Sequence, residues 1–157
     1  MDPELEHADY MRQVMELACQ NLRRPFAAIV VDPVNGEVVS EGLNKSYHNP
    51  ILHAELVAIT EAVKNCEDPD WKSFVLYTTA EPNVMAISGI LWTGIGKVVY
   101  GSSLATLREL GYRHIEIPAA EVVERAVDLD CELVGGIRES ECDEIFAAAM
   151  KLEKAGL

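Results

Sequence analysis

Basic residues are scarce in this chain: 13 Lys and Arg stand against 26 Asp and Glu, a formal net charge of −13 over 157 residues. Proteins that bind nucleic acid neutralise phosphates with Lys and Arg, so a charge of this sign disfavours such a partner. The one local basic cluster is Arg23-Arg24. The composition therefore predicts no nucleic-acid partner and favours a small uncharged or cationic ligand.

Long apolar runs are also absent, and none approaches the ~18 residues of a membrane span. The segment 1–4 is acidic, whereas a signal peptide begins with a basic region. No two cysteines form a CxxC pair, so we expect reduced thiols and no disulfide framework. These absences predict a cytoplasmic protein without membrane contact. The cysteines are Cys19, Cys66, Cys131 and Cys142.

The length and the apolar content indicate one folded domain. Hydrophobic residues make up 49% of the chain and charged residues 25%, which is ordinary for a globular protein with a core. A chain of this length suits one domain better than two, and the sequence shows neither an internal repeat nor a low-complexity linker. We expect a single domain over residues 1–157, with its core at about 7–137 and a C-terminal helix at about 138–154.

Helical and strand patterns alternate along the chain. The first helix is followed by two strands joined at Asn35-Gly36, a dipeptide typical of hairpin turns. Further strands and helices then alternate, which predicts an α/β fold with a sheet between helices. The predicted helices cover residues 7–22, 53–65, 83–93, 104–110, 119–126 and 138–154. The predicted strands cover 26–31, 38–44, 74–78, 97–100, 114–117 and 132–134.

Two short motifs carry a family resemblance. His53-Ala54-Glu55 opens one predicted helix, and Glu81-Pro82 precedes the next about thirty residues later. This pattern resembles the zinc-dependent cytidine deaminase superfamily, whose signature is H-x-E followed by P-C-x-x-C. Within it, the chain is most similar to guanine and nucleoside deaminases, and next to tRNA adenosine deaminases. The resemblance covers about 7–154 and implies a three-layer α/β/α sandwich with a mixed sheet of about five strands. Supporting similarities lie at 25–28, 42–44, 90–95, 119–126 and 135–137.

The zinc ligands of that signature are incomplete here. In the family, one His and two Cys hold Zn²⁺ and a water takes the fourth position. The resemblance gives the His position to His53, but Asn83 and Ala86 occupy the two cysteine positions. Ala86 cannot bind a metal, and a neutral amide is a poor zinc ligand beside a thiolate. We therefore expect no cofactor; zinc would require a non-standard site that joins His53 to His48 or Asn83.

Loss of zinc changes the chemistry that can be expected. Zn²⁺ lowers the pKa of its bound water from about 15.7 to about 7, a change worth on the order of 11 kcal/mol. The resemblance implies that Glu55 is the proton shuttle, and general base catalysis contributes only ~10²–10⁴-fold. Zinc-style hydrolysis is therefore not expected unless metal ligands come from elsewhere in the fold.

The candidate ligand-binding residues each have a structural alternative. By resemblance Asn44 would hydrogen-bond a base, although Asn is also a common turn residue. Asn83 either caps its helix or offers its amide to a ligand. Arg23-Arg24 either complement a helix C-terminus or change the charge at the pocket mouth. The complete ligand-binding set is Phe26, Asn44, His53, Ala54, Glu81, Asn83 and Trp92, of which the two aromatic residues are otherwise core; Glu55 is the catalytic candidate.

Three functions stay open. The first is a deaminase-fold protein that binds a small nucleobase-like ligand without zinc and has metal-free acid–base chemistry through Glu55. The second is an active hydrolytic deaminase of non-peptide C–N bonds with a rebuilt metal site. The third is a non-catalytic subunit or regulator. The retained Glu55 disfavours the third and the missing cysteines disfavour the second, so we favour the first. The resemblance also implies a homodimer.

Overall fold

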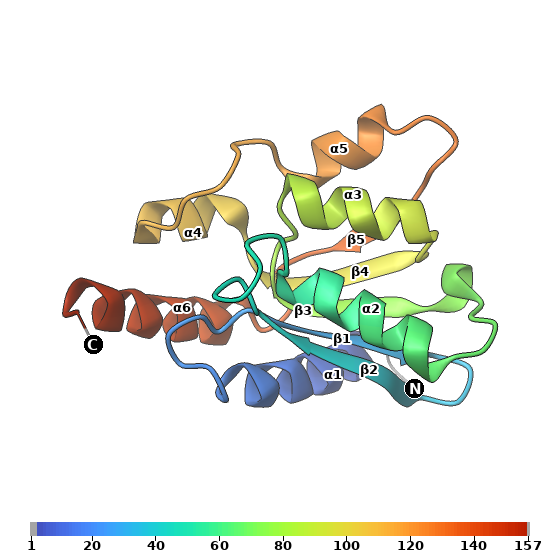
Figure 1. Ribbon diagram of the computed structural model, residues 1–157, viewed down its shortest axis with the longest axis horizontal. Coiled ribbons are helices and arrows are strands. Elements are labelled where there is room, and N and C mark those ends of the chain that lie inside the picture. The colour runs from blue at the N-terminus through green and yellow to red at the C-terminus, as the bar shows by residue number, and fades with distance from the viewer. Residues whose placement is uncertain (1–2, 157) are drawn as a thin grey trace.

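The computed structural model describes residues 3–156 and contains one mixed sheet of five strands (Figure 1). The strand order is β2-β1-β3-β4-β5. Strand β1 pairs antiparallel with both β2 and β3, whereas β3, β4 and β5 run parallel. This confirms the predicted mixed sheet. The strands are β1 (Ala27–Asp32), β2 (Glu37–Leu43), β3 (Val75–Ala80), β4 (Lys97–Ser102) and β5 (Glu132–Val134).

Helices cover both faces of the sheet, as the predicted three-layer sandwich requires (Figure 1). One face packs against α1 and α6, and the other against α2 and α3. Helix α5 lies on α3, and α4 lies on α6. The helices are α1 (Pro3–Ala18), α2 (Ala54–Asn65), α3 (Val84–Thr93), α4 (Leu104–Leu110), α5 (Ala119–Arg125) and α6 (Glu139–Lys154), with a 3₁₀ turn at Trp71–Ser73.

The two apolar layers follow from the period of two along the strands. In β1, Ala28 and Val30 belong to the core beneath α2 and α3, whereas Ile29 and Val31 face α1. All six residues of β3 are buried because helices cover both of its faces. The continuous apolar sequence of β3 is therefore the expected sequence of a central strand.

A glycine brings the end of β2 against the start of α2. A Cβ atom on Gly42 would lie 2.3 Å from the carbonyl oxygen of Ala54 and 2.5 Å from the backbone nitrogen of Ala58. Any larger side chain would force the helix away from the strand. This contact sets the first turn of α2 beside the loop that follows β2, where the candidate site residues lie.

Two predictions about secondary structure were wrong. The first helix covers Pro3–Ala18 and ends four residues before the predicted residue 22, and a series of turns follows it. Residues 114–117 form no strand; Ile115 and Ile117 are exposed, and the sheet edge beside β4 is occupied by β5. The other predicted elements are confirmed within two residues of their bounds. Within residues 3–156, no helix combines the length and apolarity that a membrane crossing needs.

Candidate functional site

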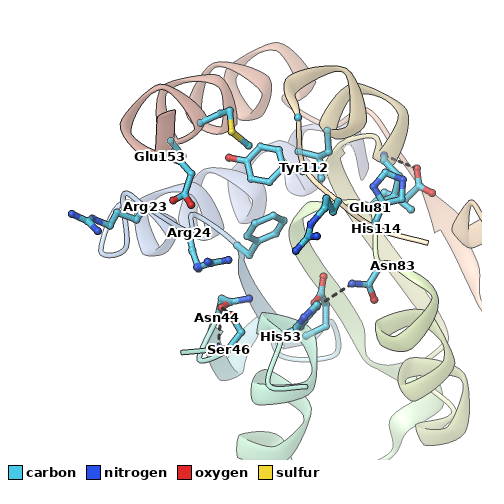
Figure 2. A pocket seen from close by; sticks show the side chains of 18 residues that line it. Arg23, Arg24, Asn44, Ser46, His53, Glu81, Asn83, Tyr112, His114 and Glu153 are labelled. Atoms are coloured by element: carbon cyan, nitrogen blue, oxygen red, sulfur yellow. Dashed lines mark hydrogen bonds between the residues drawn. The ribbon is translucent and has the colours of Figure 1, made fainter. Parts of the chain in front are cut away.

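A cavity of about 400 Å³ lies where β1 begins and where β2 and β3 end (Figure 2). Its walls come from the first turns of α2 and α3, from α4 and the loop after it, and from the end of α6. The cavity brings together the predicted site residues except Ala54, Trp92 and the alternative metal ligand His48. Those that line it are Phe26, Asn44, His53, Glu55, Glu81 and Asn83.

Glu55 is a buried carboxyl group at the cavity. It is the second residue of α2, its exposed fraction is 5%, and it accepts a hydrogen bond of 3.1 Å from the Thr78 hydroxyl. Burial raises the pKa of Glu55, and hydrogen bonds from its own backbone N–H and from Thr78 oppose part of that rise. A carboxyl group with a raised pKa suits proton exchange near neutral pH.

Asn83 connects His53 to the first turn of α3. Its amide nitrogen lies 3.0 Å from Nδ1 of His53, and its amide oxygen accepts a hydrogen bond of 3.0 Å from the backbone N–H of Ala86. Because an amide NH₂ only donates, Nδ1 of His53 is the acceptor. Burial lowers the pKa of His53; a hydrogen bond to the backbone of Pro50 opposes this shift, and the charge of Arg24 adds to it. His53 is thus held neutral, and Asn83 is both a helix cap and a lining residue.

These residues do not fit the zinc site that the resemblance implies. A zinc site of that kind needs one imidazole and two thiolates. Here Nδ1 of His53 already accepts from Asn83, and Ala86 has no donor atom. His48 does not join them, because it is exposed, stacks on Tyr47 and is absent from the lining. Among residues 3–156, no three His, Cys, Asp or Glu side chains gather as a possible metal site.

Asn44 holds the turn after β2 and also lines the cavity. It is buried, and its amide oxygen accepts from the backbone N–H and the hydroxyl of Ser46 at 3.0 and 2.7 Å. This arrangement holds the turn after β2. The amide nitrogen donates to no residue within the described part of the chain, so it is available to a ligand in the cavity.

Glu81 lines the cavity, but its carboxyl group is used inside the protein. One oxygen accepts from the backbone N–H of Leu104 at 3.3 Å, and the other from that of Ala119 at 2.9 Å. Leu104 and Ala119 are the first residues of α4 and α5. Glu81 therefore anchors two helix starts to the end of β3, a role that differs from the predicted ligand contact.

Ala54 and Trp92, which the sequence predicts as ligand-binding residues, do not line this cavity. Ala54 is fully buried against β2. The exposed fraction of Trp92 is 79%, and it lines a separate groove between α3 and α5. Trp92 lies nine residues after the cap of α3, which at 1.5 Å per residue is about 13 Å along the helix.

The sequence interpretation missed the wall formed by the loop after α4 and by α6. The ring of Tyr112 packs edge-on against Phe26 and Phe146, and its hydroxyl donates to the Phe146 carbonyl oxygen at 2.9 Å. This contact fixes the loop on α6. The sequence predicted a strand at 114–117, which includes His114, and placed Tyr112 and Arg113 in no motif, so it did not point to this wall. The missed lining residues include Tyr112, Arg113, His114, Met150 and Glu153.

Comparisons with known proteins identify a family and support the fold. Residues 5–102 match the family described as the cytidine and deoxycytidylate deaminase zinc-binding region. A guanine deaminase of Bacillus subtilis is 29% identical over 129 residues, 74% of this chain and 81% of the relative. A tRNA-specific adenosine deaminase of Haemophilus influenzae is 34% identical over 98 residues, 59% of this chain and 56% of the relative. A mutant of the protein NE0047, solved in complex with 8-azaguanine, superposes with a TM-score of 0.82 at 20% identity, over 92% of this chain and 86% of that one.

Proposed function

The chain belongs to the cytidine and deoxycytidylate deaminase zinc-binding family, and we propose that it binds a small nucleobase-like ligand in the cavity without zinc. In this proposal Glu55 exchanges protons with the bound ring. The observation that carries the proposal is a buried Glu55 carboxyl group in a cavity whose metal-ligand positions are closed by a His53–Asn83 hydrogen bond. The likeness to a guanine deaminase and to an 8-azaguanine complex supports a nitrogenous ring as the ligand.

The polar groups of the cavity complement such a ring. A nucleobase presents donors and acceptors along one edge and two apolar faces. The free amide N–H groups of Asn44 offer donors, Glu55 offers a group that donates when protonated and accepts when ionised, and Phe26 offers an apolar surface. A cavity with a few convergent polar groups on an apolar lining is the usual form of a small-molecule site.

General acid–base catalysis by Glu55 alone is weaker than metal-assisted hydrolysis. A positioned carboxyl group accelerates a reaction by ~10²–10⁴-fold. Zinc acidifies its bound water, which is worth on the order of 11 kcal/mol and corresponds to a much larger acceleration. The proposed chemistry is thus proton transfer to and from a ring that is more reactive than guanine. A hydrolytic deaminase would need metal ligands beyond those at His53, Asn83 and Ala86.

Zinc content tests the metal part of the proposal. We expect protein purified without chelator or affinity metal to carry substoichiometric zinc by mass spectrometry. The double substitution Asn83→Cys with Ala86→Cys is expected to gain about one zinc per chain, because it restores two thiolates beside His53. Asn83→Ser with Ala86→Ser is the matched control and should gain none. One tightly held zinc per wild-type chain would contradict the proposal and favour the hydrolytic alternative.

Calorimetric titration with 8-azaguanine, guanine, adenine and cytosine tests the ligand part. We expect saturable binding of at least one of these bases, and Asn44→Asp is expected to weaken it. This variant keeps the oxygen that Ser46 uses and removes the free donor, so the loss should be about 0.5–1.5 kcal/mol, or roughly 2- to 12-fold in Kd. Trp92→Ala, outside the cavity, should leave Kd unchanged. No binding by any base would refute the nucleobase assignment.

A further inference from the structure

The arginines of this protein differ in whether they have a carboxylate partner. Outside the cavity each forms an ion pair: Arg12 with Glu16, Arg108 with Glu116, Arg125 with Glu121 and Arg138 with Glu141. The remaining three, Arg23, Arg24 and Arg113, all line the cavity and have no ion pair with any described residue. Carboxylates outnumber basic groups two to one in this chain, so unpaired arginines gathered at one cavity call for an explanation.

These arginines approach the cavity from two separate segments. Arg23 and Arg24 precede β1, and Arg113 belongs to the loop between α4 and α5. Figure 2 shows the Arg24 side chain between Glu153 and Asn44, whereas Arg23 extends away from the centre. The charge of Arg24 lowers the pKa of both His53 and Tyr112, although burial is the larger influence on each and raises the pKa of Tyr112 overall. Its field therefore reaches both sides of the cavity.

The lining also holds three carboxyl groups, which differ in how far they are used inside the protein. Both oxygens of Glu81 accept backbone N–H groups. Burial favours the protonated form of Glu55. Glu153, on α6, is the remaining carboxyl group of the lining, and it forms no ion pair with a described residue. With Glu55 protonated, three arginines of the lining face two carboxylates, Glu81 and Glu153, in a protein that is strongly anionic as a whole.

A histidine next to Arg113 adds a second, independent observation. The Nδ1 atom of His114 is buried and has no hydrogen-bond partner among the described residues, and His114 lines the same cavity. A buried polar atom without a partner costs free energy, so a ligand atom that satisfies it stabilises the complex. Arg113 and His114 thus present adjacent polar groups from one wall.

We propose that the ligand of this cavity carries an anionic group, a phosphate or a carboxylate, bound by Arg24 and Arg113 with Arg23 at the rim. The guanidinium fork matches both anions with paired hydrogen bonds. The ring part of this ligand rests on the proposed function, whereas the anion site rests on the arginines and on the unpartnered Nδ1 atom of His114. A volume of about 400 Å³ lies within the range of sites for drug-sized ligands. This anionic ligand differs in charge from the uncharged or cationic ligand that the overall composition predicted.

Matched pairs of probes test the anion site by calorimetric titration. Guanosine is compared with guanosine monophosphate for the phosphate, and uracil with orotate for the carboxylate. We expect the anionic member of one pair to bind at least about tenfold tighter than its neutral mate, and the pair that responds identifies the anion. Arg24→Gln and Arg113→Gln should each lower the affinity of that anionic probe roughly 10- to 100-fold. Arg125→Gln, outside the cavity, should not change it, and Glu153→Gln should strengthen binding.

The outcomes separate this inference from the proposed function. Equal affinities within both pairs would overturn the anion site and leave the nucleobase proposal standing. Inorganic phosphate that binds in an Arg24- and Arg113-dependent way, with no affinity for any neutral base, would support the anion site and refute the nucleobase proposal. A short RNA that binds more tightly than guanosine monophosphate through the same arginines would overturn the small-ligand assignment.

Discussion

Glu81→Ala is expected to lower the free energy of unfolding by roughly 2–6 kcal/mol, because it leaves two buried backbone N–H groups without acceptors at about 1–3 kcal/mol each. These groups belong to Leu104 and Ala119, the first residues of α4 and α5. Glu81 has an exposed fraction of only 8%, so water does not readily replace the lost acceptors. Urea unfolding followed by circular dichroism measures the change.

Two companion variants make the Glu81 result specific. Glu81→Gln keeps one oxygen acceptor and should lie between the wild type and Glu81→Ala; it also serves if the alanine variant does not fold. Glu61→Ala removes a surface carboxylate that pairs only with Lys64 on α2, so its effect should stay within about 0.5 kcal/mol. A wild-type unfolding curve for Glu81→Ala would show that its two hydrogen bonds do not hold the helices.

Glu55→Gln is expected to reduce any turnover by ~10²–10⁴-fold, the usual contribution of a general acid or base. Glutamine keeps the size of the side chain and an oxygen for the Thr78 hydroxyl, so the fold should persist. Ammonia release from a panel of nucleobases, nucleosides and nucleotides measures the effect on any substrate that the wild type converts. Thr78→Val is the second variant and removes only the hydroxyl contact. Unchanged activity in Glu55→Gln would remove Glu55 from the reaction.

The pH dependence of stability tests the state of Glu55 without any substrate. Burial raises its pKa above the ordinary 4.5, so the folded protein favours the protonated form, and ionisation costs stability as the pH rises above that value. Glu55→Gln carries no such cost. It should melt at a higher temperature than the wild type at pH 8, and the difference should vanish by about pH 4. A constant difference across this range would contradict a raised pKa.

Local signals determined which elements were predictable from the sequence. Helix α4 matches its predicted bounds because Ser103 caps its start and Gly111, with φ of 105°, ends it. Helix α3 is similarly bounded by Asn83 and Gly94. The strand predicted at 114–117 failed for a different reason: the edge of β4 accepts only one partner, and β5 fills it. A short local pattern does not show which of two distant segments will pair with a given strand.

The residues of the candidate site also differ in whether a local sequence motif could predict them. His53, Glu55 and Asn83 lie in motifs with recognisable spacing, so the sequence brought them together before the fold was known. Arg113 and His114 reach the cavity only because Tyr112 fixes their loop on α6 through the Phe146 carbonyl. That contact joins residues 34 positions apart. The sequence offered Arg23 and Arg24 at the pocket mouth as one alternative, but the contribution of Arg113 could be seen only in three dimensions.

Strand β3 and the loop at residues 111–118 both border the cavity, but their amide hydrogens should exchange with solvent through different kinds of opening. Strand β3 is bonded on both edges and buried throughout, so its amide hydrogens should exchange with solvent only when the whole protein unfolds. Its end leads directly to Glu81 at the floor of the cavity. The opposite wall, residues 111–118, has no regular structure and should exchange through local opening. Strand β3 and this loop should therefore differ widely in the rate at which their amide hydrogens exchange.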